Sequence, residues 1–184
     1  MESSPYYLYH PYCAKRIHNK LPKVKIIILL RNPIDRAYSN YKMERKKGKE
    51  VSDTFQEALD KEYDRIKSLE KNFDDEDFVF LHQNFSYFQR GLYYEQVKRY
   101  FNYFDKDQIL ILKSENFFEN PENVLKKIYD FLGVRKEMPD GMKSFKSSYE
   151  AIIPKKLFIF LVQKYKHDIH KLEQLIDLKF EWFE

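Results

Sequence analysis

The chain contains two short apolar runs, and elsewhere its apolar residues recur mostly at helical spacing. Residues 25–30 and 108–112 are rich in Ile and Leu and lack polar alternation, which is typical of strands buried on both faces of a parallel sheet. An Asn-Pro pair follows each run, at residues 32–33 and 120–121, as the N-cap and first residue of a helix. The pattern therefore predicts two strand-helix units.

Three further segments repeat apolar residues at helical spacing. They are a segment that begins at residue 53 or 54, a segment over residues 93–104, and a tail over residues 155–176 that forms one or two helices. The acidic stretch at residues 74–77 is predicted to be a surface loop. The predicted helical faces consist of Phe55, Leu59, Tyr63 and Ile66, then Tyr93, Val97, Tyr100, Phe101 and Phe104, and finally Leu157, Phe160, Leu161, Tyr165, Ile169, Leu172 and Ile176.

The alternation of strands and helices predicts an α/β domain with a mainly parallel sheet flanked by helices. Ligands of such sheets bind at the carboxyl ends of the strands, where Arg31 is expected. A chain of 184 residues without an internal repeat or low-complexity linker is predicted to be one domain over residues 1–184.

The composition excludes several classes of protein. With 43% hydrophobic and 17% aromatic residues the chain is too apolar for disorder, and its single cysteine, Cys13, excludes an internal disulfide framework. No apolar run reaches the roughly 20 residues of a membrane span, and no secretory signal is evident, so we expect a cytoplasmic protein. His167 and His170 fall on adjacent helical turns, but no third ligand is evident, so no metal is predicted.

The charge favours an anionic ligand only weakly. The net charge is +4, but 29 acidic residues are interspersed with 33 basic ones, which does not indicate nucleic acid as a partner. The densest basic stretch, residues 45–49, stands at a predicted helix end, where cations suit the helix dipole and solvent.

The segment over residues 31–39 carries the candidate chemistry. Arg31 ends the first strand, and Ser39 stands about 10.5 Å of helical rise beyond the cap. A guanidinium and a hydroxyl at this spacing can approach one phosphate from two sides. The alternative is that Arg31 pairs with a carboxylate such as Asp35 while Ser39 sits on the helix surface; the spacing permits both.

The full string at residues 31–39, Arg-Asn-Pro-Ile-Asp-Arg-Ala-Tyr-Ser, resembles very closely the 3'-phosphate-binding motif of sulfotransferases. These enzymes use 3'-phosphoadenosine 5'-phosphosulfate, and the resemblance is closest to the bacterial and heparan sulfate groups. It implies a P-loop-like three-layer fold, in which Arg31 and Ser39 hold the 3'-phosphate of the sulfuryl donor.

Weaker matches extend the resemblance over nearly the whole chain. The segment at residues 2–8 is similar to the family's Glu-x-Ser-Pro-x-Tyr-Leu stretch, which makes Glu2 a candidate catalytic base; alternatively Glu2 is a frayed terminal residue. Arg90-Gly-x-Tyr93 resembles a helix opening near the donor, and Ser114 follows the second strand as in the family. The resemblance thus adds Tyr93 and Ser114 as candidate nucleotide-binding residues, or as packing residues.

The chain departs from the family at the phosphate loop. Family members carry a Lys-x-Gly-Thr-Thr-like loop that holds the 5'-phosphosulfate, and no such segment occurs in the 184 residues, so we expect an N-terminally incomplete domain. The glycine-rich donor loop is also not evident; residues 143–148 occupy its place, as a phosphate contact or an ordinary connection.

The sequence as a whole predicts sulfuryl transfer from 3'-phosphoadenosine 5'-phosphosulfate to a hydroxyl or amine, on a carbohydrate or small metabolite. One alternative is a catalytically inactive module that binds a nucleotide or a protein. Another is an RNA-binding protein, but the aromatic residues fall on predicted core faces. Neither the acceptor nor the oligomeric state can be predicted from the sequence.

Overall fold

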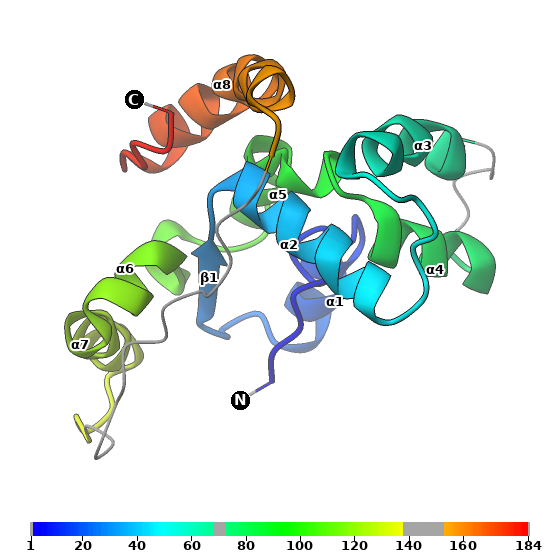
Figure 1. Cartoon of the computed structure of the whole chain (residues 1–184). Helices are drawn as coiled ribbons and strands as arrows, with labels where there is room; N and C mark the ends of the chain where they lie inside the picture. The colour runs from blue at the N-terminus through cyan, green and yellow to red at the C-terminus, as the bar shows by residue number, and fades with distance from the viewer. Residues whose placement is uncertain (1, 68–72, 138–152, 184) are drawn as a thin grey trace. The chain divides into compact units, whose positions relative to one another are not determined.

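A computed structural model describes residues 2–67, 73–137 and 153–183 (Figure 1). The chain divides into two units, each described by itself. The first, which we call the sheet unit, comprises Met1–Arg31 and Gln96–Glu150. The second, the helical unit, comprises Asn32–Glu95 and Ala151–Glu184. Helix α5 (Tyr93–Phe101) begins in the helical unit and continues into the sheet unit.

The remaining elements divide between the two units. The sheet unit contains α1 (Cys13–Lys20), β1 (Ile26–Leu30), η2 (Lys106–Gln108), β2 (Ile109–Lys113), α6 (Ser114–Glu119) and α7 (Pro121–Leu132). The helical unit contains α2 (Pro33–Lys46), α3 (Phe55–Lys67), α4 (Glu76–Phe85), η1 (Gln89–Gly91) and α8 (Lys155–Ile176).

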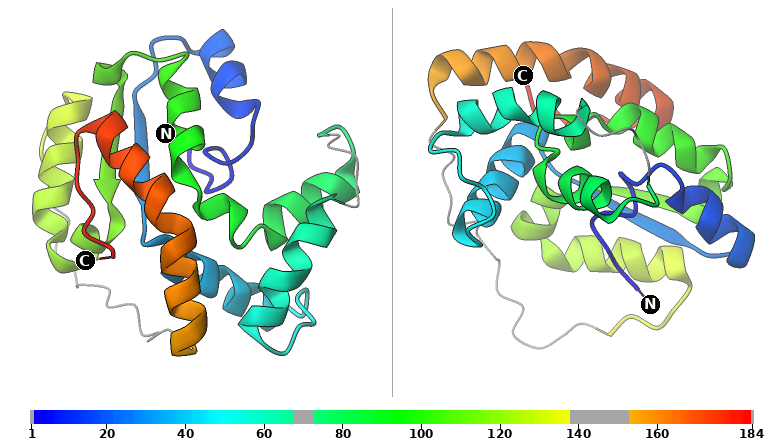
Figure 2. Two further views of the ribbon diagram at one scale, coloured as in Figure 1. Left: turned by 90° about the horizontal axis from the view of Figure 1, so that it is seen from above. Right: turned by 90° about the vertical axis from the view of Figure 1, so that its right-hand side faces the viewer.

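Strands β1 and β2 lie side by side and parallel (Figure 2). Ile26 pairs with Ile109 at one end of the ladder and Leu30 with Lys113 at the other. The predicted α/β class with a parallel sheet is confirmed. The second strand begins one residue later than predicted, because Gln108 closes the preceding turn and donates its side-chain amide to main-chain carbonyls of residues 22 and 24.

Helix α7 begins and ends as its sequence predicts. The side chain of Asn120 accepts the N–H of Asn123, Pro121 is the first helical residue, and Gly133 ends the helix at φ 71°, in the left-handed region. The short segment between β2 and α7 forms the six-residue helix α6, which the sequence pattern did not predict. Both helices pack against β2.

Helix α2 has the predicted cap in the helical unit. Asn32 Oδ1 accepts the N–H groups of Ile34 at 2.9 Å and Asp35 at 3.4 Å, and Pro33 is the first helical residue. Buried Ile34, Ala37 and Tyr41 form the inner face of α2. The cap therefore fixes where the helix starts after β1.

Helix α4 corrects the prediction of a surface loop at residues 74–77. Asp75 accepts the N–H groups of Asp77 and Phe78 as an N-cap, and acidic residues in the first turn suit the helix dipole. Phe78, His82 and Phe85 then bury one face at spacings of four and three residues. The acidic stretch is therefore the start of a helix.

The tail over residues 155–176 is a single helix, α8, that packs against α2. Its buried face consists of Leu157, Leu161, Tyr165, Ile169 and Leu172. The predicted face is confirmed at these positions, whereas Phe160 is half exposed.

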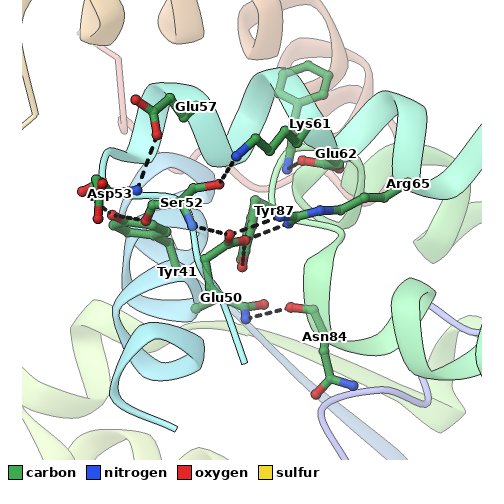
Figure 3. A network of polar contacts seen from close by, with 12 residues as sticks. Tyr41, Glu50, Ser52, Asp53, Glu57, Lys61, Glu62, Arg65, Asn84 and Tyr87 are labelled. Atoms are coloured by element: carbon green, nitrogen blue, oxygen red, sulfur yellow. Dashed lines mark hydrogen bonds and ion pairs between the residues drawn. The ribbon is translucent and has the colours of Figure 1, made fainter. Parts of the chain in front are cut away.

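A buried carboxylate organises the loop between α2 and α3 (Figure 3). Glu50 accepts hydrogen bonds from the Arg65 guanidinium at 2.5 and 2.9 Å, the Ser52 N–H at 2.8 Å and the Tyr87 hydroxyl at 2.9 Å. Burial raises the pKa of Glu50, but these hydrogen bonds outweigh burial and hold that pKa at about 2. The ionised carboxylate therefore ties the loop to α3.

Candidate functional site

Arg31 and Ser114 stand at the carboxyl edge of the parallel sheet. Because Leu30 pairs with Lys113, the next residues of the two strands leave the sheet at the same level. Arg31 is half-buried. Within the described part of the chain, the Oγ atom of Ser114 is buried and has no hydrogen-bond partner. Buried hydroxyl groups usually have a partner, so this atom is a candidate ligand contact.

Ser39 lies on α2 in the helical unit and is half-buried. Its neighbours on the helix fix the rotation of α2. Asn40 donates its side-chain amide to the carbonyl of Asn84 at 3.1 Å, and the Tyr41 hydroxyl donates to the carbonyl of Asp53 at 2.8 Å. Ser39 therefore has a defined orientation within this unit.

Glu2 is exposed and belongs to the sheet unit. Its carboxylate accepts a hydrogen bond from the Tyr7 hydroxyl, and this bond raises the pKa of Tyr7. The carbonyl of Tyr7 in turn accepts the Tyr100 hydroxyl at 2.9 Å, which ties the N-terminal segment to α5. Glu2 is thus hydrogen-bonded in the structure, and its role as a base stays a prediction.

Tyr93 is the first residue of α5 and is only 3% exposed. Its N–H donates to Asp168 at 2.7 Å, and its ring centroid lies 6.1 Å from that of Trp182. Little of this side chain remains for a ligand, so the observed surroundings are those of a packing residue.

Sequence reasoning missed a buried carboxylate on α3. The apolar periodicity assigned Tyr63 to the inner face, but Tyr63 is 61% exposed and Glu62 is 2% exposed. Glu62 accepts the main-chain N–H groups of Phe88 and Gln89, which offsets only part of the cost of its burial. Hydrophobic periodicity carries no signal for a carboxylate buried in this way.

His167 and His170 are exposed on α8, and across residues 2–67, 73–137 and 153–183 no group of three or more His, Cys, Asp or Glu side chains is arranged to hold a metal ion. In the same ranges no helix is both long enough and apolar enough to cross a bilayer. The candidate phosphate contacts at residues 143–148 lie outside the described residues.

Comparison with known proteins identifies the family. The sulfotransferase domain matches residues 10–152, and the chain belongs to the sulfotransferase family. The crystal structure of a sulfotransferase from Alicyclobacillus acidocaldarius superposes with a TM-score of 0.80 and 32% sequence identity, over 97% of this chain and 65% of that one.

Two curated relatives agree with this assignment. The membrane-associated sulfotransferase kil1 of Dictyostelium discoideum is 22% identical over 247 residues, which cover 98% of this chain and 52% of the relative. The bifunctional heparan sulfate N-deacetylase/N-sulfotransferase 1 of Xenopus tropicalis is 31% identical over 142 residues, which cover 74% of this chain and 15% of the relative. The chain therefore spans about half of the first relative and a smaller part of the second.

Proposed function

We propose that the protein transfers a sulfuryl group from 3'-phosphoadenosine 5'-phosphosulfate to a hydroxyl or amine. Arg31 and Ser39 hold the 3'-phosphate, and Ser114 adds a hydroxyl at the same sheet edge as Arg31. The observation that carries the proposal is the buried Oγ of Ser114, which has no hydrogen-bond partner among the described residues and stands at the sheet edge where β1 also ends, in a chain of the sulfotransferase family. The role of Tyr93 is to pack the start of α5.

In the proposed reaction Glu2 and Arg31 have different roles. The acceptor oxygen or nitrogen attacks sulfur, the bond from sulfur to the 5'-phosphate oxygen breaks, and that oxygen leaves with the electron pair. The acceptor loses its proton to a base, for which Glu2 is the candidate. Arg31 supplies charge and a rigid donor fork for the 3'-phosphate, so it orients the donor rather than touching the reacting sulfur.

A carbohydrate or small metabolite is the acceptor class that we propose. Among the similar proteins, the Xenopus enzyme is named for heparan sulfate, as is a mouse heparan sulfate glucosamine 3-O-sulfotransferase 6. Both names point to sulfated polysaccharides as acceptors of those proteins. The acceptor of this chain is assigned to that class by similarity alone.

A second candidate function is a nucleotide-binding module without transfer activity. The 184 residues contain no Lys-x-Gly-Thr-Thr-like segment, so on their own they offer contacts for the 3'-phosphate without this loop. Such a loop neutralises the leaving 5'-phosphate with amide groups and a lysine as sulfur is transferred. A module of this kind keeps the 3'-phosphate contacts and lacks the chemistry at the other end of the nucleotide.

A transfer assay separates the two candidates. The protein is incubated with donor labelled with ³⁵S and with desulfated heparan oligosaccharides, and the label on the saccharide is counted. Label that appears with wild-type protein and falls in Arg31→Ala supports the enzyme. Binding of adenosine 3',5'-bisphosphate without any transferred label supports the binding module instead.

A further inference from the structure

A buried carboxylate of α3 holds the main chain after α4. Glu62 uses both of its oxygens: Oε2 accepts the N–H of Phe88 at 2.6 Å, and Oε1 accepts the N–H of Gln89 at 2.8 Å. Burial raises the pKa of Glu62 to about 7, although the two hydrogen bonds act in the opposite direction. Burial of the Glu62 carboxyl group therefore costs free energy. The contacts that this group makes are the hydrogen bonds to the main chain at residues 88 and 89.

A second carboxylate, on α8, holds the start of α5. The Oδ2 atom of Asp168 accepts the N–H groups of Tyr93 at 2.7 Å and Tyr94 at 3.2 Å. The first N–H groups of a helix have no partner within the helix, and the preceding residue, Leu92, has no side-chain acceptor. Asp168 thus caps α5 from a distant helix.

The segment held in this way supports α2. We call residues 84–94 the support segment. Its carbonyl groups accept side-chain donors of α2: Arg36 donates to the carbonyl of Tyr87, and Asn40 donates to that of Asn84 at 3.1 Å. Ser39 lies on α2 directly before Asn40. The rotation of α2, and with it the direction of Ser39, therefore depends on the support segment.

The support segment also packs tightly against the first residue of α2. A Cβ atom at Gly91 would lie 2.7 Å from the Tyr165 hydroxyl and 3.0 Å from Pro33 Cβ. The Tyr165 hydroxyl donates to the carbonyl of Phe88 at 3.0 Å. Since only a glycine fits here, a displacement of the segment is transmitted directly to the N-terminus of α2.

We propose that Glu62 and Asp168 are positioning residues for the 3'-phosphate site: they fix the support segment, which orients α2 and its Ser39. The inference rests on the proposed function, because it assumes that Ser39 contacts the 3'-phosphate. Neither carboxylate touches the nucleotide in this arrangement. Both act through main-chain hydrogen bonds within the helical unit.

The hydrogen bonds predict that Glu62 and Asp168 respond differently when an amide replaces the carboxylate. Glu62 needs two acceptor oxygens, so Glu62→Gln places an NH₂ group against a main-chain N–H and loses one bond. Asp168 uses a single oxygen for both bonds, so Asp168→Asn retains them through its carbonyl oxygen, whereas Asp168→Ala loses both. The amide is therefore expected to replace the carboxylate at position 168 and to fail at position 62.

Calorimetric titration with adenosine 3',5'-bisphosphate and with 5'-AMP tests the proposal. Glu62→Gln and Asp168→Ala are expected to weaken bisphosphate binding about tenfold, with 5'-AMP affinity unchanged, and Asp168→Asn to stay within about twofold of wild type. In a Ser39→Ala background these losses should disappear, because the positioned group is gone. Equal losses for both nucleotides, or an additive effect in the Ser39→Ala background, would overturn the positioning role.

A measurement without nucleotide keeps the test independent of binding. In two-dimensional NMR spectra, Glu62→Gln and Asp168→Ala should shift the Ser39 amide signal and speed hydrogen exchange at Phe88 and Tyr93, respectively. Asp168→Asn should leave the Ser39 signal in place, as should the control Glu57→Gln, whose exposed carboxylate accepts the Asp53 N–H. An unmoved Ser39 signal in both disruptive variants contradicts the inference. A different result would separate the two proposals. If Arg31→Ala does not affect bisphosphate binding but the Ser39 amide signal moves as expected in Glu62→Gln and Asp168→Ala, then the proposed function is wrong, whereas the positioning of Ser39 by the two carboxylates is supported.

Discussion

Arg31 and Ser114 follow residues that are register partners in neighbouring parallel strands, Leu30 and Lys113. Two polar residues far apart in the sequence are thereby placed at one edge of a sheet, where α/β proteins bind their ligands. The hydroxyl of Ser114 is buried without a partner in the described chain, although hydroxyl groups in proteins are rarely left so. This relationship underlies the assignment of the nucleotide site.

Arg31→Ala is expected to weaken binding of adenosine 3',5'-bisphosphate by about 1.5 to 3 kcal/mol, or roughly 10- to 150-fold in Kd, because it removes the charge-assisted phosphate contact that we propose for Arg31. Isothermal titration measures this directly. Arg45→Ala is the control, since Arg45 forms an exposed ion pair with Asp53 at 3.4 Å on the far end of α2. Equal Kd values for wild type and Arg31→Ala would remove Arg31 from the site.

Ser114→Ala is expected to change nucleotide affinity without lowering the stability of the fold. Deleting a buried hydroxyl that has no partner should leave the free energy of unfolding unchanged or raise it slightly, while nucleotide affinity falls by about 1 kcal/mol if the hydroxyl contacts the ligand. Urea unfolding and nucleotide titration of the same preparation provide both numbers. A loss of stability with unchanged affinity would show that the hydroxyl serves the fold instead.

The pH dependence of stability should report on Glu62. Its pKa is about 7 in the folded chain against an ordinary value of 4.5, so the unfolded chain loses this proton first as pH rises. The contribution of Glu62 is complete below pH 4.5 and is lost as pH rises through 7, by at most about 3 kcal/mol.

Glu62→Gln removes this component of the pH dependence. Glutamine does not titrate, so the stability of the variant lacks the fall that ionisation of Glu62 causes in wild type, and the difference between the two proteins should shift in favour of the variant from pH 5 to pH 8. Urea unfolding of both proteins from pH 5 to pH 8 provides the comparison. A constant difference across that range would mean that Glu62 does not titrate there.

Gly91→Ala should destabilise the fold by about 2 to 3 kcal/mol, because the added methyl group would lie 2.9 Å from Tyr165 Cε1 and 3.0 Å from Pro33 Cβ. Gly48→Ala is the matched control: it has open space around its Cβ position, and its φ of 72° costs only about 1 kcal/mol. Thermal unfolding ranks the two variants. A smaller loss at position 91 than at 48 would contradict the close packing.

Sequence patterns within a few residues predicted those elements whose boundaries are set by neighbouring residues. The apolar runs predicted both strands, and the Asn-Pro pairs predicted the starts of α2 and α7, because caps act within a few residues. The helices α1, α4 and α6 were missed. At α4 the acidic residues 74–77 suggested a loop, yet Asp75 in that stretch is the helix cap.

The candidate site was predictable only in part. Similarity to a family motif indicated Arg31 and Ser39, whereas the residues that we propose to position Ser39 could not be found this way. Glu62 and Asp168 bond to main-chain groups far along the chain, and neither hydrophobic periodicity nor spacing encodes such a partner. Tyr93 resembled a ligand contact by motif, but its burial follows from the packing of α5.

The most direct test of the central claim is calorimetric titration of the 184-residue chain with adenosine 3',5'-bisphosphate and, in parallel, with 5'-AMP, after circular dichroism has shown that the chain is folded. We predict a clear preference for the bisphosphate, because in the proposed site Arg31 and Ser39 bind the 3'-phosphate that 5'-AMP lacks. Equal affinities, or no binding of either nucleotide by the folded chain, would contradict the assignment.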